Sequence, residues 1–237
     1  ISMDFNDGPL GGSAEASNGS NPSFSDAAGA TKYDACTGFA NDGQCAIMSI
    51  NNGQAGFGTW GGRINFNNLG LSNLTPGTEV WVSVKLFIPT GFNYDAIPHL
   101  KFLRFHTKSP DSSNEGYNDL YFKPKVSNYP PFFFVKEQQD LAKFFGTDSD
   151  KVILGTWETY EMYLSMDYRS VANGGKSRMR VWKNGALLAD YDDIQTLKTA
   201  NSFSEAFLIF TYWNGGSPQS QSDNIIRPSP PRNLLVN

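Results

Sequence analysis

The chain has 237 residues, a mass of 26.1 kDa, a formal net charge of −4 and a sequence pI of about 5.2. This acidic balance argues against nucleic acid as the main partner, because phosphate binding needs a basic field over the domain. No apolar run approaches the roughly 20 residues that cross a bilayer, so no membrane span is expected. The 23 Gly, 13 Pro and 14% aromatic residues indicate many strands joined by tight turns. We therefore expect one all-β domain over residues 1–237.

The N-terminal part contains both cysteines and a group of acidic residues. Cys36 and Cys45 bracket a short polar loop, CTGFANDGQC. They form either a disulfide, worth roughly 2–3 kcal/mol and typical of an oxidising compartment, or two free buried thiols. Asp4 and Asp7, with Asp223 near the other terminus, are either turn residues or ligands of a structural Ca²⁺. No other cofactor is expected.

The middle of the chain alternates as strands do. Val80 to Ile88 is the clearest case, because aliphatic residues occupy every second position. Leu100 to Thr107 is the next predicted strand, and it should present Phe102, Arg104 and His106 on one face. Asp119 to Lys123 follows and places a further set on one face: Asp119, Tyr121 and Lys123.

The one helix that the sequence predicts lies at Lys136 to Phe145. This segment has an apolar stripe at helical spacing, and Gly146 can end it. A later strand is predicted at Ala206 to Trp213. The last residues, 227–237, form a Pro-rich tail that we expect to be a linker or a docking end.

The stretch Gly155 to Asp190 predicts three strands in a fixed order. Trp157 to Asp167 alternates with period two, and Arg178 to Trp182 forms the second strand. Asn184-Gly185 supplies the positive-φ pair of a tight hairpin, after which Ala186 to Ala189 runs back as the third strand. The layout G-x-W, then W-x-N-G-x-L-L, resembles the concanavalin A-like lectin/glucanase superfamily. That resemblance implies a two-sheet antiparallel β-jelly-roll sandwich, here with one short helix, of the kind that binds or cuts glycans.

Arg104 and His106 suit the cleavage of a uronate, because an Arg can hold a carboxylate bidentately and a His can move a proton near neutral pH. The constellation resembles the jelly-roll polysaccharide lyases, which cleave acidic glycans by β-elimination. By that resemblance Arg104 would neutralise the sugar carboxylate and His106 or Tyr121 would take the C5 proton. A tyrosine would protonate the leaving O4. The alternative is a solvated strand face without chemistry.

Individual sequence motifs of alginate lyases and glucanases can be compared with this chain. Residues Tyr121 to Tyr129, YFKPKVSNY, echo the YFKAGxYNQ motif of alginate lyases, but Ser127 stands where that motif has its second Tyr. Their R-x-E-x-R and Q-[IV]-H segments are absent from the sequence. The E-x-D-x-E motif of related glucanases is absent too. A glycosidase would therefore need a carboxylate pair from separate strands, such as Glu161 with Glu205.

Substrate binding is predicted for polar and aromatic side chains around the same sheet. The aromatic members can stack on sugar rings, and the last of them end a strand where the chain opens into a Gly-rich loop. The predicted binding residues are Lys123, Glu161, Tyr163, Tyr212, Trp213 and Asn214.

The sequence thus predicts a secreted or cell-surface protein whose concave sheet binds an anionic polysaccharide. The chain begins at Ile1 without a leader segment, as a mature form or a trimmed piece would. The leading hypothesis is a polysaccharide lyase. The alternatives are a non-catalytic, lectin-like carbohydrate-binding module and a structural surface or fibre subunit built on a jelly-roll scaffold.

Overall fold

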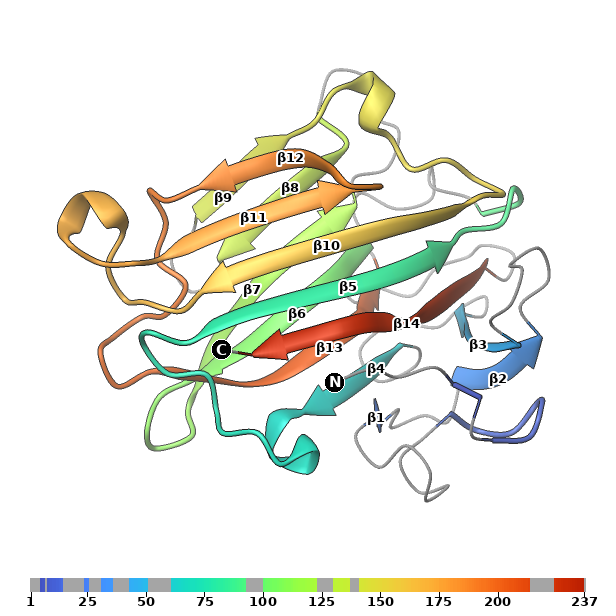
Figure 1. The fold of residues 1–237 in the computed structure, drawn as a ribbon, viewed down its shortest axis with the longest axis horizontal. Coiled ribbons are helices and arrows are strands. Elements are labelled where there is room, and N and C mark those ends of the chain that lie inside the picture. The colour runs from blue at the N-terminus through green and yellow to red at the C-terminus, as the bar shows by residue number, and fades with distance from the viewer. Residues whose placement is uncertain are drawn as a thin grey trace.

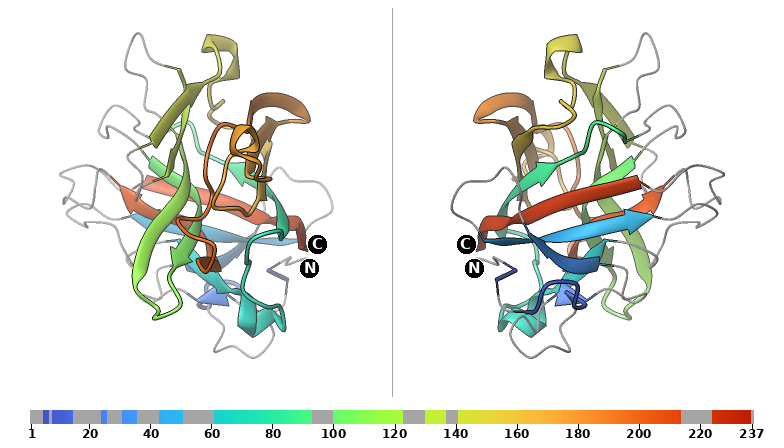
Figure 2. Two further views of the ribbon diagram at one scale, coloured as in Figure 1. Left: turned by 90° about the vertical axis from the view of Figure 1, so that its left-hand side faces the viewer. Right: turned by 90° about the vertical axis from the view of Figure 1, so that its right-hand side faces the viewer.

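The computed structural model describes residues 5–6, 8–14, 24–25, 31–35, 43–50, 61–92, 100–122, 130–136, 141–213 and 224–236. These residues form two seven-stranded sheets, and every pair of neighbouring strands is antiparallel. Figure 1 shows one sheet in front of the other, and Figure 2 shows the two layers from their sides. The predicted all-β jelly-roll sandwich is confirmed.

The first sheet lies behind in Figure 1 and the second lies in front. In spatial order the first sheet contains β1 (Phe24–Ser25), β4 (Gly62–Asn65), β13 (Phe203–Trp213), β6 (Leu100–Lys108), β7 (Asn114–Phe122), β8 (Phe132–Lys136) and β9 (Leu141–Phe145). The second contains β12 (Ala186–Tyr191), β11 (Arg178–Lys183), β10 (Trp157–Ser165), β5 (Glu79–Phe87), β14 (Asn224–Val236), β3 (Gln44–Ile50) and β2 (Thr31–Ala35).

The helices of the described residues are single short 3₁₀ turns: η2 (Phe66–Leu69), η5 (Asp148–Asp150) and η6 (Val171–Asn173). In this part of the chain no helix has the length and apolar character that crossing a membrane requires.

The core lies between the two sheets and follows directly from the period-two pattern of the strands. Alternate residues of β5 and β10 are buried, while those between them are partly exposed. Aromatic rings join the layers: Phe102 of β6 and Phe122 of β7 lie 5.2 and 5.1 Å, centroid to centroid, from Tyr160 of β10. Each such fully buried ring contributes about 1.5–3 kcal/mol. The inner faces of both sheets are therefore committed to stability, and only the outer faces can carry chemistry.

The hairpin predicted at Asn184-Gly185 is confirmed. It joins β11 to β12, and the two residues have φ angles of 50° and 81°. Positive φ at both central positions matches the right-handed twist of the flanking strands.

The helix predicted at Lys136 to Phe145 is wrong. Lys136 ends β8, and β9 begins at Leu141 and pairs with it antiparallel. The apolar spacing that suggested a helix also fits a strand, because residues four apart lie on one face in both structures. Phe145 of β9 packs against Phe132 of β8 with ring centroids 5.8 Å apart, whereas Phe144 is 45% exposed. Cross-strand packing, which no local pattern reveals, decides the conformation.

The Pro-rich tail is not a linker. Its residues 227–236 continue β14 and pair with β5 inside the second sheet. A register shift between Ser229 and Asn233 spans the two adjacent prolines, which have no N–H to donate to a ladder. Regular pairing resumes with Asn233 opposite Ser83 and continues through Val236 opposite Val80.

Strand β6 forms where it was predicted, but one of its faces was assigned incorrectly. A register shift between Lys101 and Leu103 turns Phe102 into the core, away from Arg104 and His106. The same shift brings Lys101 to the side of Arg104, where both contact Asp119 of β7. A bulge of this kind re-aims side chains without ending the strand.

Candidate functional site

The candidate site lies on the outer face of the first sheet, where β6 runs between β7 and β13. Pairing places Arg104 opposite Asp119 on one side and Leu208 on the other. His106 is likewise opposite Tyr117 and Ala206. Since these neighbours are fixed by the backbone ladder, the polar side chains of three strands are held within direct contact of one another.

Arg104 and Asp119 form the most buried ion pair of this face, and both side chains are fully buried. The Arg104 Nε donates to Asp119 Oδ1 at 2.7 Å and a terminal nitrogen donates to Oδ2 at 3.2 Å. Asp119 Oδ2 also accepts a hydrogen bond from the Tyr121 hydroxyl at 3.0 Å and lies 3.6 Å from Lys101 Nζ. Asp119 therefore anchors three side chains at once.

Tyr117 separates Arg104 from His106. The guanidinium of Arg104 lies 3.7 Å from the Tyr117 ring centroid, a cation–π distance. The imidazole of His106 stacks on the same ring, with centroids 4.6 Å apart and an interplanar angle of 23°. This packing fixes the plane of the imidazole, so His106 has little freedom to rotate.

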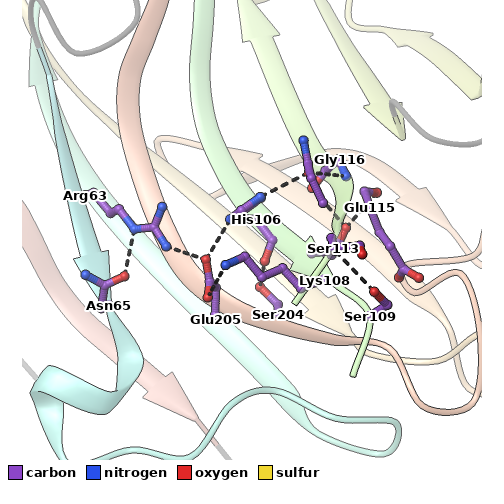
Figure 3. A network of polar contacts seen from close by, with 12 residues as sticks. Arg63, Asn65, His106, Lys108, Ser109, Ser113, Glu115, Gly116, Ser204 and Glu205 are labelled. Carbon is purple, nitrogen blue, oxygen red and sulfur yellow. Dashed lines mark hydrogen bonds and ion pairs between the residues drawn. The ribbon is translucent and has the colours of Figure 1, made fainter. Parts of the chain in front are cut away.

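Both ring nitrogens of His106 have hydrogen-bond partners, and Figure 3 shows the contact with Glu205. Nδ1 lies 2.9 Å from Glu205 Oε1, and Nε2 lies 3.1 Å from Asn114 Oδ1, which also accepts the Gly116 N–H at 2.7 Å. Burial lowers the pKa of His106, and the contacts with Glu205 and Asn114 act in the opposite direction. Burial prevails, so the pKa of His106 lies below its usual value.

Glu205 is the centre of a second charge network in Figure 3. It accepts hydrogen bonds from Arg63 at 2.5 Å and from His106, and Lys108 Nζ lies 3.1 Å away. Arg63 is in turn held by Asn65, whose Oδ1 accepts from Nε at 2.7 Å. Burial alone would raise the pKa of Glu205, but the contacts with Lys108, Arg63 and His106 outweigh it and hold the pKa below its usual value. Glu205 is therefore a carboxylate throughout the neutral range.

The structure brings together the predicted catalytic residues Arg104, His106 and Tyr121. It does not place Arg104 where it could readily meet a substrate, because its guanidinium is fully buried against Asp119 and Tyr117. Tyr121 is 4% exposed, and its hydroxyl donates to Asp119. The three residues form one connected group, of which His106 borders the cation network around Glu205.

Two predicted binding residues belong elsewhere. Glu161 and Tyr163 lie on β10 of the second sheet, on its outer face, so the sandwich core separates them from His106. Alternation along one strand identifies two faces but not which sheet the strand joins. For the same reason Glu161 and Glu205 cannot flank one glycosidic bond, and the glycosidase pair left open by the sequence is excluded.

Of the other predicted residues, two have a described backbone only, Cys45 is fully described, and six lie outside the described part of the chain. Tyr212 and Trp213 pair in register with Lys101 and Leu100, which places their backbone beside the site without describing their side chains. Cys45 is buried in β3. Among the described residues no cluster of three or more His, Cys, Asp or Glu side chains could hold a metal. Outside the described residues lie Asp4, Asp7, Cys36, Lys123, Asn214 and Asp223.

Sequence reasoning named Glu205 only as half of a glycosidase pair, not as the partner of His106, and it missed Arg63 and Asn114. Glu205 and His106 are 99 residues apart in the chain, and they meet only because β13 pairs with β6. A usable signal was present for Tyr117, which alternates with Asp119 and Tyr121 in the strand NEGYNDLYF and so shares their face.

Comparison with known proteins finds likeness in structure but not in sequence. No protein-family profile matches the chain, and no curated protein matches it. The alginate lyase Aly36B has a similar structure, with a TM-score of 0.68 and 15% identity over 100% of this chain and 96% of that one. The Chlorella virus alginate lyase vAL-1 gives 0.58 and 11%, over 87% of this chain and 89% of that one. The Trichoderma reesei endo-β-1,4-glucuronan lyase gives 0.55 and 9%, over 87% and 86%.

These likenesses define the class of fold: a jelly-roll sandwich of the type that polysaccharide lyases use. The resemblance predicted from Gly155 to Asp190 is confirmed at this level. At 9–15% identity the likeness establishes the fold, and the chemistry has to be argued from the residues of this chain.

Proposed function

We propose that the protein is a lyase that cleaves an acidic, uronate-containing polysaccharide by β-elimination on the outer face of the first sheet. The observation that carries the proposal is the pairing of His106, whose pKa burial lowers, with the ionised Glu205 among partly exposed cations. The fold supports it, since similar structures are those of alginate and glucuronan lyases. Variants of Aly36B have been solved with an alginate trisaccharide and tetrasaccharide.

His106 is the proposed base. Glu205 would hold a proton on Nδ1, and Nε2 would accept a proton once the Asn114 oxygen, which can only accept a hydrogen bond, has moved away from it. Nε2 faces the side chain of Asn114, an exposed residue at the first position of β7. Substrate binding would displace this side chain and bring the C5 hydrogen of a uronate to Nε2. Glu205 then stabilises the imidazolium that forms, as a carboxylate does in other His–carboxylate pairs.

The charges of this face suit an anionic polymer. Four cationic side chains contact two carboxylates, which leaves two positive charges in excess within a chain of net charge −4. Among the four, the side chains of Arg63 and Lys108 are 30% and 23% exposed, whereas Arg104 is fully buried. We assign recognition of the sugar carboxylates to Arg63, Lys108 and Lys101. Arg104 has a positioning role, since it holds Asp119 and the Tyr117 ring.

Tyr117 is the proposed acid. Its ring stacks directly on His106, and it is more exposed than Tyr121, which is 4% exposed. In the elimination the C5–H bond breaks toward His106 and its electrons form the C4–C5 double bond. The C4–O4 bond breaks at the same time, and O4 leaves with the Tyr117 proton. Proton transfer from His106 back to Tyr117 completes the cycle, so no other reactant is consumed.

The test is incubation of the protein with alginate, glucuronan, ulvan and glycosaminoglycans while ultraviolet absorbance of the unsaturated uronate is followed. We expect product from at least one polymer and a rate loss of about 10²–10⁴-fold in His106→Gln. If the wild-type protein forms no unsaturated product from any of these polymers, the proposed lyase activity is excluded.

A lectin-like binding module is the second candidate, and one observation favours it. His106 is only 7% exposed and Arg104 is fully buried, so the key side chains are packed among their partners. A binding module would retain saturable affinity for an acidic glycan and release no unsaturated product. Binding and cleavage measured on the same polymer therefore separate the two candidates.

Three further features remain predictions from the sequence, and each can be tested by one experiment. Secretion is tested by locating the protein in the native culture, and the Cys36–Cys45 disulfide by mass spectrometry without reduction. A structural Ca²⁺ at Asp4, Asp7 and Asp223 would appear as a lower melting temperature after chelation.

A further inference from the structure

The outer face of the second sheet carries an aromatic strip that the proposed lyase reaction does not use. In β5, β10 and β11 the alternate residues are buried in the core, so the residues between them face outward. Figure 1 looks onto this face, with these strands in the front layer and the first sheet behind them. We define the aromatic strip by its five ring-bearing residues: Trp81, Phe87, Trp157, Tyr163 and Trp182.

At one end of the strip, three rings pack together. Trp81 stacks on Trp182 with centroids 4.6 Å apart and an interplanar angle of 20°, and Trp81 contacts Tyr163 edge-on at 5.9 Å. Trp81 and Trp182 come from strands that flank β10, where Trp182 is opposite Glu161 and Trp81 is opposite Tyr163. The Trp81 indole N–H donates to Glu161 Oε2 at 3.1 Å. All of these rings remain partly exposed.

At the other end, Phe87 and Trp157 form a second aromatic pair, with centroids 5.5 Å apart. Phe87 lies six positions after Trp81 in β5, which corresponds to about 20 Å along a strand. Polar side chains of Ser83, Lys85 and Thr159 lie between the two pairs. The strip is therefore elongated and has two apolar ends joined by hydrogen-bonding groups, a shape that fits a linear polymer better than a single small molecule.

The charges on this face compensate one another. Asp190 binds Arg178 bidentately at 2.6 Å and Arg180 at 3.1 Å, and the Arg178 contact lowers the pKa of Asp190. Glu161 is engaged by Trp81, and burial together with a hydrogen bond to Glu79 raises the pKa of Tyr163. Among the described outward-facing residues of β5, β10, β11 and β12, three cations are balanced by three carboxylates, so this face, unlike the one around His106, has no excess of cations. The cations are Lys85, Arg178 and Arg180, and the carboxylates are Glu79, Glu161 and Asp190. Its electrostatics complement a neutral partner.

We infer that the aromatic strip is a second glycan-binding site, separate from the candidate active site, and that it takes a neutral polysaccharide of linked pyranose rings. The C–H faces of pyranose rings stack on Trp and Tyr, while Glu161 and Arg180 accept from and donate to sugar hydroxyls. Stacked aromatics on a sheet surface also strengthen the sheet, but that role does not require rings at both ends of a charge-balanced strip. The inference does not depend on the lyase reaction.

The test measures binding of the full chain by calorimetry to two soluble probes: a linear β-1,4-linked glucose oligosaccharide and an alginate oligosaccharide. We expect saturable binding of the neutral probe, weakened about five- to tenfold by Trp182→Ala. Glu161→Gln, which keeps the size of the side chain, should also weaken it. Leu10→Ala is the control, because Leu10 is a 60% exposed apolar residue beside β2, at the other edge of the second sheet from β11. It should leave the affinity unchanged.

Three results would overturn the inference. One is the absence of saturable binding of the neutral probe to the wild-type chain. Another is unchanged binding of the neutral probe by Trp182→Ala and Glu161→Gln, with both variants shown to be folded. The third is loss, in the same variants, of binding to the alginate probe alone, which would identify the strip as part of an acidic-glycan site. His106→Gln should not change binding at the strip, so failure of the lyase proposal and failure of this one are distinguishable.

Discussion

Asp119→Asn tests the idea that Arg104 is a positioning residue held by a buried ion pair. The substitution keeps the shape of the side chain and removes the charge that neutralises a fully buried guanidinium. Breaking a buried pair in this way costs about 3–5 kcal/mol. For a chain of this size each kcal/mol lowers the melting temperature by about 2–4 °C, so we expect a decrease of about 6–20 °C.

The matched control is Asp190→Asn. Asp190 also binds an arginine bidentately, but its side chain is 28% exposed and that of its partner Arg178 is 35% exposed. An exposed pair is worth about 0–1 kcal/mol, so this variant should melt within a few degrees of the wild-type protein. Thermal denaturation followed by circular dichroism compares the two. Equal and small shifts in both variants would refute the assignment of Arg104 and Asp119 to a structural pair.

Three further predictions concern the reaction. Glu205→Gln removes a group that raises the pKa of His106, so the acid limb of the pH profile of kcat/KM should move to lower pH. The plateau of kcat/KM should fall by at least about tenfold. An acid limb at the wild-type pH would contradict the pairing of His106 with Glu205. Tyr117→Phe should lower kcat by about 10²-fold with little change in KM, and an unchanged kcat would exclude Tyr117 as the acid. Lys108→Gln should raise KM for an acidic polymer and reduce its salt dependence. The distant, exposed Lys151→Gln should do neither.

Local patterns predicted the strands and some of the site, but not what depends on pairing between strands. The two-residue spacing of Arg104 and His106 correctly placed both on one face, since alternation is a property of the strand itself. The position of Phe102 was wrong because a register shift against β7 turns it inward. Glu205 could not be assigned to His106 from the sequence, because only the pairing of β13 with β6 brings them together.

The same limit explains the two elements that were assigned incorrectly. The segment Leu141–Phe145 contains residues that a helix would accept, and its strand conformation comes from pairing with β8. The tail after Ile226 has the proline content of a linker, yet Asn233 to Val236 find partners along β5. In both cases long-range pairing overrides local composition, as it commonly does in sheets.

The most direct test of the central claim is the fate of solvent oxygen during cleavage. The protein is incubated with alginate or glucuronan in water labelled with heavy oxygen, and the masses of the products are measured by mass spectrometry. β-Elimination breaks the C4–O4 bond without adding water, so we predict unsaturated products that contain no solvent oxygen and that disappear in His106→Gln. Saturated products carrying heavy oxygen would show hydrolysis and would contradict the proposed reaction.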